Sequence, residues 1–249
     1  MTDYHKQKYD GNLILEIAPE AVLIPVSTIV SSLVLLVDST WTRSIGLAII
    51  IILTIIVIWF FRSPPVDTRL YQDLAPTDIA SPSYGVIHSI DKIPMDQVLQ
   101  DYGPLISTRS SRPTEIGEPF AWRIVTLLNV FDVHVQCAPV SGSIMRHIYQ
   151  PGTFHPVGFT EKSAYNERNI TEFSTAGGNI YVVLIAGMLA RKISIFPEYE
   201  RPGEKINRGD KYAIIKFGSR VDTIIPSNYQ VLVHPGETVV GGETLLATL

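Results

Sequence analysis

The chain has 249 residues, 46% of them hydrophobic and 18% charged, with a formal net charge of −4 at pH 7. A slightly acidic chain without a basic field gives no basis for binding nucleic acid, so we expect no nucleic-acid partner. The single cysteine, Cys137, excludes an internal disulfide and a multi-cysteine metal site, and we expect no metal centre.

Two uncharged apolar stretches follow an N-terminal segment of residues 1–20. They cover residues 21–37 and 44–61, and each is close to the ~20 residues that cross a bilayer as a helix. The second ends in Trp59-Phe60-Phe61-Arg62, an aromatic and cationic anchor typical of the membrane interface. Because the connection between them is short, we predict a transmembrane helical hairpin over 21–61. The alternative is a pair of buried helices in a soluble core, which needs a partner layer to cover an apolar surface on all sides.

Basic residues are distributed unevenly around this hairpin. Lys6 and Lys8 precede it. Arg62 and Arg69 follow it, whereas only Arg43 lies in the connection. Cytoplasmic flanks of membrane helices carry an excess of lysine and arginine. We therefore predict that both ends of the hairpin, and the domain that follows it, lie on the cytoplasmic side of a membrane.

The character of the sequence changes after the hairpin. Residues 62–79 are rich in proline and charge and are predicted to form a tether. From residue 80 to residue 249, short β-rich runs alternate with Gly, Pro and Asn turns, a spacing typical of all-β domains. We predict a mainly β domain at 80–249, folded as a β-sandwich or a barrel-like sheet. Its clearest runs are VIHSI, RIVTLL, IYVVLI, YAIIKF and YQVLV.

Two short motifs in this domain carry chemistry. In DVHVQ (132–136), strand alternation places Asp132 and His134 on the same face, and histidine is suited to moving protons near neutral pH. A half-buried, hydrogen-bonded histidine without a catalytic role is the alternative. Farther along, Gly218-Ser219 interrupts the apolar run IIKFGSRVDTIIP (214–226). On these two residues alone, a surface turn is the ordinary interpretation.

Other segments are less specific. Residues 151–169 are polar, aromatic and loop-like, and they form either a lid against a lipid surface or an ordinary exposed connection. The apolar run 180–190 is too short for a third membrane span and is predicted to be a buried strand and turn. Four further histidines show no metal-ligand spacing and are expected at the surface or in turns; they are His88, His147, His155 and His234.

Taken together, several segments resemble the phosphatidylserine decarboxylase proenzymes, in their short membrane-anchored branch. FGS followed by RVDTIIP (217–226) resembles the self-cleavage site of that family. NVFDVHVQCAPVSGSI (129–144) resembles its histidine segment. YNERN (165–169) and VVLIAGMLARKI (182–193) resemble its central segments. The resemblance covers residues 59–249 in order.

The resemblance implies that the chain cleaves itself and then acts as a lyase. Ser219 would attack the carbonyl carbon of Gly218 with His134 as the base, so that the chain splits into 1–218 and 219–249. The shorter piece would begin with a pyruvoyl group derived from Ser219, the cofactor that accepts electrons during decarboxylation. The implied reaction converts phosphatidylserine into phosphatidylethanolamine at a phospholipid membrane, as a step of phospholipid biosynthesis.

Two arginines in the matching segments are candidates for substrate binding. Guanidinium groups pair well with phosphate oxygens, so Arg168 and Arg191 are candidates to bind the phosphate of the lipid headgroup. An ordinary solvated surface charge is the alternative for each of them. The oligomeric state stays open, a homo-oligomer included.

The chain departs from the family pattern at one position. The family carries a segment like Ser-Pro-Ala-Asp-Gly, whose aspartate orients the histidine during self-cleavage. Here the segment reads SPSYG (81–85), and Tyr84 stands at that position. A phenol can hydrogen-bond an imidazole, but with an unperturbed pKa of about 10 it supplies no negative charge at neutral pH. Tyr84 itself, Asp78 and Asp132 are the candidates for this relay. The departure leaves open a second function, an uncleaved and catalytically inactive decarboxylase-like membrane protein with a binding or structural role.

Overall fold

The computed structural model describes most of the chain after the first 39 residues. Its contacts divide the chain into two compact units, Met1–Pro65 and Val66–Leu249. The first unit contributes one described helix, and the second contains every described strand. The described residues are 40–71, 74–94, 97–98, 120–156, 163, 165–187, 192–216 and 219–249.

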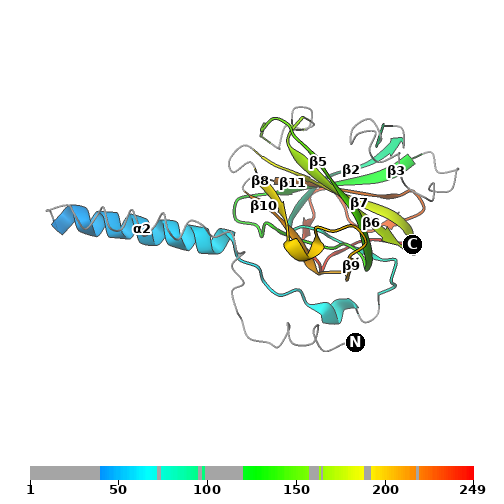
Figure 1. Ribbon diagram of the computed structural model, residues 1–249, viewed down its shortest axis with the longest axis horizontal. Coiled ribbons are helices and arrows are strands. Elements are labelled where there is room, and N and C mark those ends of the chain that lie inside the picture. Colours follow the sequence, from blue (N-terminus) through cyan, green and yellow to red (C-terminus); the bar gives the residue numbers. More distant parts are fainter. Residues whose placement is uncertain are drawn as a thin grey trace. The chain divides into compact units, whose positions relative to one another are not determined.

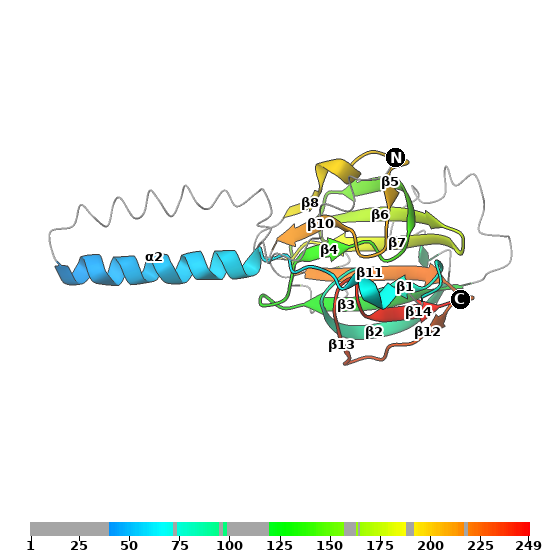
Figure 2. The ribbon, with the colours of Figure 1, turned by 90° about the horizontal axis from the view of Figure 1, so that it is seen from below.

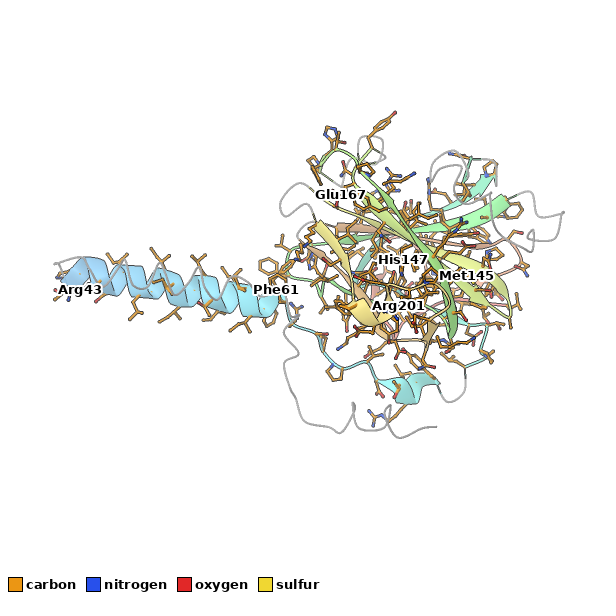
Figure 3. The ribbon with its side chains drawn as sticks, in the orientation of Figure 1. Arg43, Phe61, Met145, His147, Glu167 and Arg201 are labelled. Carbon is orange, nitrogen blue, oxygen red and sulfur yellow. The ribbon has the colours of Figure 1, made fainter. Side chains whose placement is uncertain are left out.

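The described helix of the first unit, α2, spans Thr40–Phe60. It begins before the expected start at residue 44, and its stretch Arg43–Phe60 has the length and apolar composition of a membrane span. Most of its large apolar side chains are exposed between Arg43 and Phe61 (Figure 3), which supports association with a membrane. The other half of the predicted hairpin, 21–37, lies outside the described residues, so the hairpin stays a prediction.

Polar groups along α2 are bonded inside the helix. The hydroxyl of Thr54 donates to the carbonyl oxygen of Ile50 at 2.8 Å, a bond that suits a hydroxyl in an apolar setting. After the helix ends, the Arg62 guanidinium lies 4.3 Å from the ring centroid of Trp59 and donates to the Trp59 carbonyl oxygen. This cation–π pair is the aromatic and cationic cluster expected of an interfacial anchor.

The second unit is mainly β, as predicted. Its largest sheet has eight strands in the spatial order β13-β2-β3-β11-β7-β6-β5-β9 and curls into a half-barrel (Figure 1). All its neighbouring pairs are antiparallel. The strands are β2 Gly85–Pro94, β3 Phe120–Leu128, β5 Gly142–Gln150, β6 Arg168–Thr175, β7 Gly178–Ile185, β9 Lys205–Ile206, β11 Ser219–Pro226 and β13 Thr238–Val239.

Two small sheets accompany the curled sheet. One has the order β4-β10-β8 and the other β1-β14-β12. Their strands are β4 Val135–Cys137, β10 Lys211–Lys216, β8 Lys192–Ile195, β1 Ile79–Ala80, β14 Leu245–Thr248 and β12 Gln230–Val231. Short 3-10 helices occur at Thr68–Tyr71 and Pro197–Tyr199.

Strand β11 lies at the centre of the curled sheet, between β3 and β7. Val221 and Ile225 belong to the larger apolar cluster, which the curled sheet shares with residues of both small sheets. Ile224 belongs to a second cluster on the opposite face. We call the two faces inner and outer. All eight residues of β11 are buried, which explains why this strand lacks the polar alternation of a one-sided sheet.

The proline-rich stretch predicted as a tether is attached to the β unit from Val66 onward. Val66 is 7% exposed, and the amide of Asp67 donates to a carboxylate oxygen of Glu243 at 3.1 Å. Arg208 donates to the carbonyl oxygen of Ala75. These contacts fix much of the stretch on the surface of the β unit.

Candidate active site

Ser219 is the first residue of β11 and lies opposite Leu128, the last residue of β3. Strand alternation places its side chain on the inner face with Val221. The residue is fully buried, and its hydroxyl makes no hydrogen bond to any described residue. Burying an unsatisfied hydroxyl costs about 1–3 kcal/mol, and Ser219 shares this property with Thr126 and Thr223. Gly218 lies outside the described residues.

His134 is held in one tautomer by its own turn. The residue is fully buried, and its Nδ1 lies 2.9 Å from the carbonyl oxygen of Asp132. Because a carbonyl oxygen only accepts, Nδ1 carries the hydrogen and Nε2 is the nitrogen with a lone pair. The carbonyl oxygen of His134 in turn accepts from the side-chain amide of Gln136 at 2.8 Å. This arrangement leaves Nε2 as the basic nitrogen of the ring.

The fold brings the segments of Ser219 and His134 together at one end of the curled sheet. The amide of Ile215 in β10 donates to the carbonyl oxygen of His134 at 3.1 Å, and Ser219 follows four residues later. Leu128 lies beside Ser219, and the chain from Leu128 leads directly to His134. We call this the Ser219 end, where β3, β5 and β7 finish and β6 and β11 begin. In Figure 2, β10 ends and β11 begins at the same end of the sheet.

The prediction that Asp132 and His134 share a strand face is wrong, because β4 begins only at Val135. Asp132 lies in a turn in which its carboxylate accepts from the amide of Asn129 at 2.8 Å. In a second hydrogen bond between these residues, the Asn129 carbonyl oxygen accepts from the Asp132 amide. Such side-chain-to-backbone bonds compete with strand pairing. The Asp132 carbonyl oxygen therefore bonds to Nδ1 of His134, while the Asp132 carboxylate accepts from the Asn129 amide.

Tyr84 lies between the two segments of the site. The carbonyl oxygen of Pro82 accepts from the amide of Cys137 in β4 at 2.8 Å. Three residues later the chain enters β2, which pairs with β3. The stretch around Tyr84 thus connects β4, which follows His134, to β3, which ends beside Ser219.

The environments of the two other relay candidates differ. The Tyr84 ring packs on Gly241, where an added Cβ would lie only 2.8 Å from a ring carbon. The carboxylate of Asp78 accepts from the amide of Ala75 at 2.8 Å and from the hydroxyl of Thr248 at 2.6 Å. Asp78 therefore stabilises the local turn and its link to β14.

Arg168 is buried on the outer face of the curled sheet. It lies opposite Ile185 of β7, and Ile185 lies opposite Arg220 of β11, so the three side chains share one row. The Nε of Arg168 donates to the carbonyl oxygen of Asn166 at 3.2 Å. The Ser219 side chain points to the inner face. Arg191, the second candidate for phosphate binding, lies outside the described residues.

A buried ion pair next to Ser219 was not expected from the sequence. Arg220 donates to both carboxylate oxygens of Asp222, at 2.6 and 2.7 Å. A third bond joins its Nη1 to the hydroxyl of Ser163 at 3.1 Å. The side chains of Arg220 and Asp222 are 6% and 0% exposed. The i, i+2 spacing of opposite charges in RVD was the sequence signal for this pair.

Three further buried polar groups surround the site and were also missed. They are the Ser83 hydroxyl, the Thr126 hydroxyl and the side-chain carbonyl of Gln136, and none bonds to a described residue. Thr126 lies on β3, which neighbours β11, while Gln136 lies on β4 and Ser83 precedes β2. A hydroxyl at position 126, between the inward Ile124 and Leu128, was the available signal.

The remaining histidines and the cysteine differ in how far they are buried. His88 and His234 are exposed, as predicted. His147 is not exposed. Its Nε2 donates to the Tyr199 carbonyl oxygen at 2.8 Å, and burial lowers the pKa of the imidazole. Desolvation disfavours the charged imidazolium there. Cys137 is buried, as expected of a core cysteine, and burial raises the pKa of its thiol to about 12.

Comparison with known proteins identifies the family. The family model described as phosphatidylserine decarboxylase matches residues 53–247. Three relatives carry the name phosphatidylserine decarboxylase proenzyme. The protein of Gluconacetobacter diazotrophicus is 36% identical over 77% of this chain and 76% of its own length. That of Xanthobacter autotrophicus is 35% identical over 89% and 84%, and that of Mycobacterium leprae is 36% identical over 85% and 77%. The chain therefore belongs to the phosphatidylserine decarboxylase family, whose members are carboxy-lyases.

Proposed function

We propose that this chain decarboxylates phosphatidylserine to phosphatidylethanolamine after cleaving itself between Gly218 and Ser219. The observation that carries the proposal is the buried Ser219 hydroxyl, without a hydrogen bond to any described residue, at the start of β11. The segment of His134 lies beside it. Membership in the decarboxylase family supplies the reaction class.

The proposed self-cleavage uses Ser219 as nucleophile and His134 as base. Nε2 of His134 takes the hydroxyl proton while the oxygen attacks the carbonyl carbon of Gly218, and the peptide nitrogen leaves with a proton. The acyl group then rests on oxygen as an ester. Loss of the Cα proton of residue 219 expels the Gly218 carboxylate and leaves dehydroalanine. Hydrolysis of that residue releases ammonia and yields the pyruvoyl group.

The residues present fit such a group. A buried position with unsatisfied polar neighbours, Thr126 and Gln136 among them, suits a new chain end that carries carbonyl oxygens. When formed, the pyruvoyl group supplies an electron-accepting carbonyl for the loss of carbon dioxide. The chain's own contribution is to exclude water around Ser219, to place the polar headgroup and to move protons at His134 Nε2.

The substrate and membrane assignments extend this proposal. We propose that Arg168 and Arg191 bind the lipid phosphate, and that the catalytic domain, about residues 80–249, lies on the cytoplasmic side. Arg168 is 95% buried on the outer face, whereas Ser219 faces inward, so Arg168 would reach the phosphate from the Ser219 end, where β6 and β11 both begin. The predicted hairpin over 21–61, of which α2 is the described part, would attach the chain to the membrane that contains the lipid substrate.

The fragment pattern of the purified full chain tests self-cleavage. We expect intact mass measurement to show the pieces 1–218 and 219–249, the second with a blocked N-terminus that reacts with carbonyl reagents. Incubation with phosphatidylserine should release carbon dioxide. A single chain of 249 residues that nevertheless decarboxylates the lipid would contradict the proposal.

A second function has one observation in its favour. The family aspartate is replaced by Tyr84, and Nδ1 of His134 bonds to a neutral carbonyl at 2.9 Å. A neutral carbonyl at Nδ1 stabilises the imidazolium form of His134 less than a carboxylate at that position would. An uncleaved, inactive membrane protein with a binding or structural role is the alternative. One intact chain without decarboxylase activity would favour it.

Changing Tyr84 to Asp distinguishes these two functions. We expect Tyr84→Asp to raise the first-order rate of self-cleavage by at least about tenfold, since losing a triad aspartate costs on the order of 10⁴ in rate. Tyr84→Asn is the matched control, because it has the same shape as the aspartate without the charge. Both variants remove the ring from Gly241 equally. Time courses of cleavage after synthesis give the rates, and equal rates for Asp and Asn would remove the electrostatic explanation.

A further inference from the structure

The exposed aromatic side chains in the described part of the β unit gather at one end. Phe131 is 71% exposed, Tyr165 is 73% exposed and Tyr149 is 56% exposed. Phe131 follows the end of β3, Tyr149 is the last residue but one of β5, and Tyr165 precedes β6. All three therefore lie at the Ser219 end. Exposed apolar groups that gather in one place mark interaction surfaces.

The turn that presents Phe131 is held by its own hydrogen bonds. The amide of Phe131 donates to the side-chain oxygen of Asn129 at 2.8 Å. The amide of Asn129 donates to the carboxylate of Asp132 at the same distance. A turn with this many internal bonds is pre-organised, so Phe131 is held in its exposed position by the fold.

The Tyr165 position is fixed in a comparable way. Its carbonyl oxygen accepts from both the amide and the hydroxyl of Thr153, at 2.8 and 3.0 Å. The next residue, Asn166, is buried and donates through its side chain to the carbonyl oxygen of Ala186 at 2.9 Å. The backbone on one side of Tyr165 is thus anchored in the β unit while its ring stays in solvent.

Two lysines lie at this end, which also carries the carboxylates of Asp132 and Glu167. Lys192 and Lys216 are directly opposite each other on β8 and β10. Lysine side chains near a membrane surface are attracted by anionic lipid headgroups. Lys216 also lies three residues before Ser219 in the chain.

We propose that the Ser219 end docks onto an anionic phospholipid bilayer through an aromatic rim, defined as Phe131, Tyr149, Tyr165, Lys192 and Lys216. Amphipathic rings with neighbouring lysines are the residues that settle at the headgroup level of membranes. The choice of a bilayer rests on the proposed function, because a lipid substrate must reach Ser219 from a membrane. On this proposal, the stretch 151–169, which contains Tyr165, is a surface that meets lipid.

Fluorescent labels on introduced cysteines test the docking without reference to catalysis. Cys137 is buried with a raised thiol pKa, so an environment-sensitive label reacts with the introduced site. We compare Phe131→Cys and Tyr165→Cys with the control Met145→Cys. Met145 lies in β5 and is 43% exposed. Figure 3 shows Met145 apart from Glu167, two residues beyond Tyr165. The full chain is reconstituted into vesicles of phosphatidylcholine with phosphatidylglycerol, an anionic lipid that the proposed reaction does not consume.

Labels at 131 and 165 should shift to shorter wavelength and be quenched by nitroxide-bearing lipids several-fold more than the label at 145. The effect should weaken in phosphatidylcholine alone and in Lys192→Gln. Equal quenching at all three positions would overturn the proposal, whatever the catalytic result. A preparation that never decarboxylates would refute the proposed function and leave the label result intact.

An activity measurement complements the labels. Phe131→Ser should raise KM for phosphatidylserine in vesicles by about tenfold, the size expected from losing partial burial of one aromatic ring. Turnover of a short-chain phosphatidylserine dispersed as monomers should be unchanged. Met145→Ser should leave both values as in the wild type. An equal loss on both substrates would assign Phe131 to folding or chemistry and would overturn its docking role.

Discussion

Ser219→Ala should leave a single uncleaved chain that does not decarboxylate phosphatidylserine. The change removes one oxygen from a fully buried side chain, and with it both the nucleophile of self-cleavage and the source of the pyruvoyl group. The decarboxylation rate should fall by at least ~10⁶-fold, the lower range of enzymatic acceleration. Gel electrophoresis, intact mass and carbon dioxide release measure the result.

Two matched variants separate chemistry from packing in this experiment. Thr223→Val changes another buried hydroxyl without a bond to described residues, on the same face of β11. It should cleave as the wild type does. Ser219→Cys retains a nucleophile, because a thiol can form the corresponding thioester, and it should recover part of the cleavage. Decarboxylase activity that survives in Ser219→Ala would refute the pyruvoyl assignment.

Asp222→Ala should lower the free energy of unfolding by about 3–5 kcal/mol, because it leaves the buried guanidinium of Arg220 without its carboxylate. Both side chains are almost completely inaccessible, at 6% and 0% exposure, and both bonds are 2.7 Å or shorter. Urea denaturation and the thermal midpoint of the full chain in detergent measure the loss.

The exposed pair Arg69–Asp67 is the matched control for this prediction. It has a comparable N–O distance of 2.7 Å, but its side chains are 83% and 36% exposed. Asp67→Ala should therefore change stability little. The double variant Arg220→Met, Asp222→Leu should recover much of the loss, since no buried charge remains unpaired. A loss in Asp222→Ala as small as that in Asp67→Ala would show that the buried pair contributes no more than a surface one.

The sequence predicted the mainly β character of the second unit because its runs match short strands such as β3, β7 and β10. It did not predict that both faces of β11 are buried. Every residue of Ser219–Pro226 is buried, although the run contains two charged residues. Arg220 and Asp222 neutralise each other, and that pairing depends on a geometry that composition does not contain.

The site was predicted through the resemblance, and its local structure was not. Ser219 and His134 lie in segments that the fold brings together. Alternation failed at Asp132, because bonds between Asn129 and Asp132 form a turn where the periodicity suggested a strand. The Thr126 hydroxyl makes no hydrogen bond to a described residue. In the sequence, its only sign was a polar residue at a position where an apolar one is expected. Which polar groups lack partners is set by tertiary packing.

The central position of β11 determines what would happen to the two pieces after the proposed cleavage. A break before Ser219 cuts the connection at one end of a strand that is hydrogen-bonded to β3 on one side and β7 on the other. The short product supplies β11, an interior strand of the sheet. Both strands that pair with it belong to the long product. Its departure would require both ladders to open at once, so separation and global unfolding become the same event. The mature protein should thus behave as an interlocked heterodimer whose subunits dissociate only under denaturing conditions.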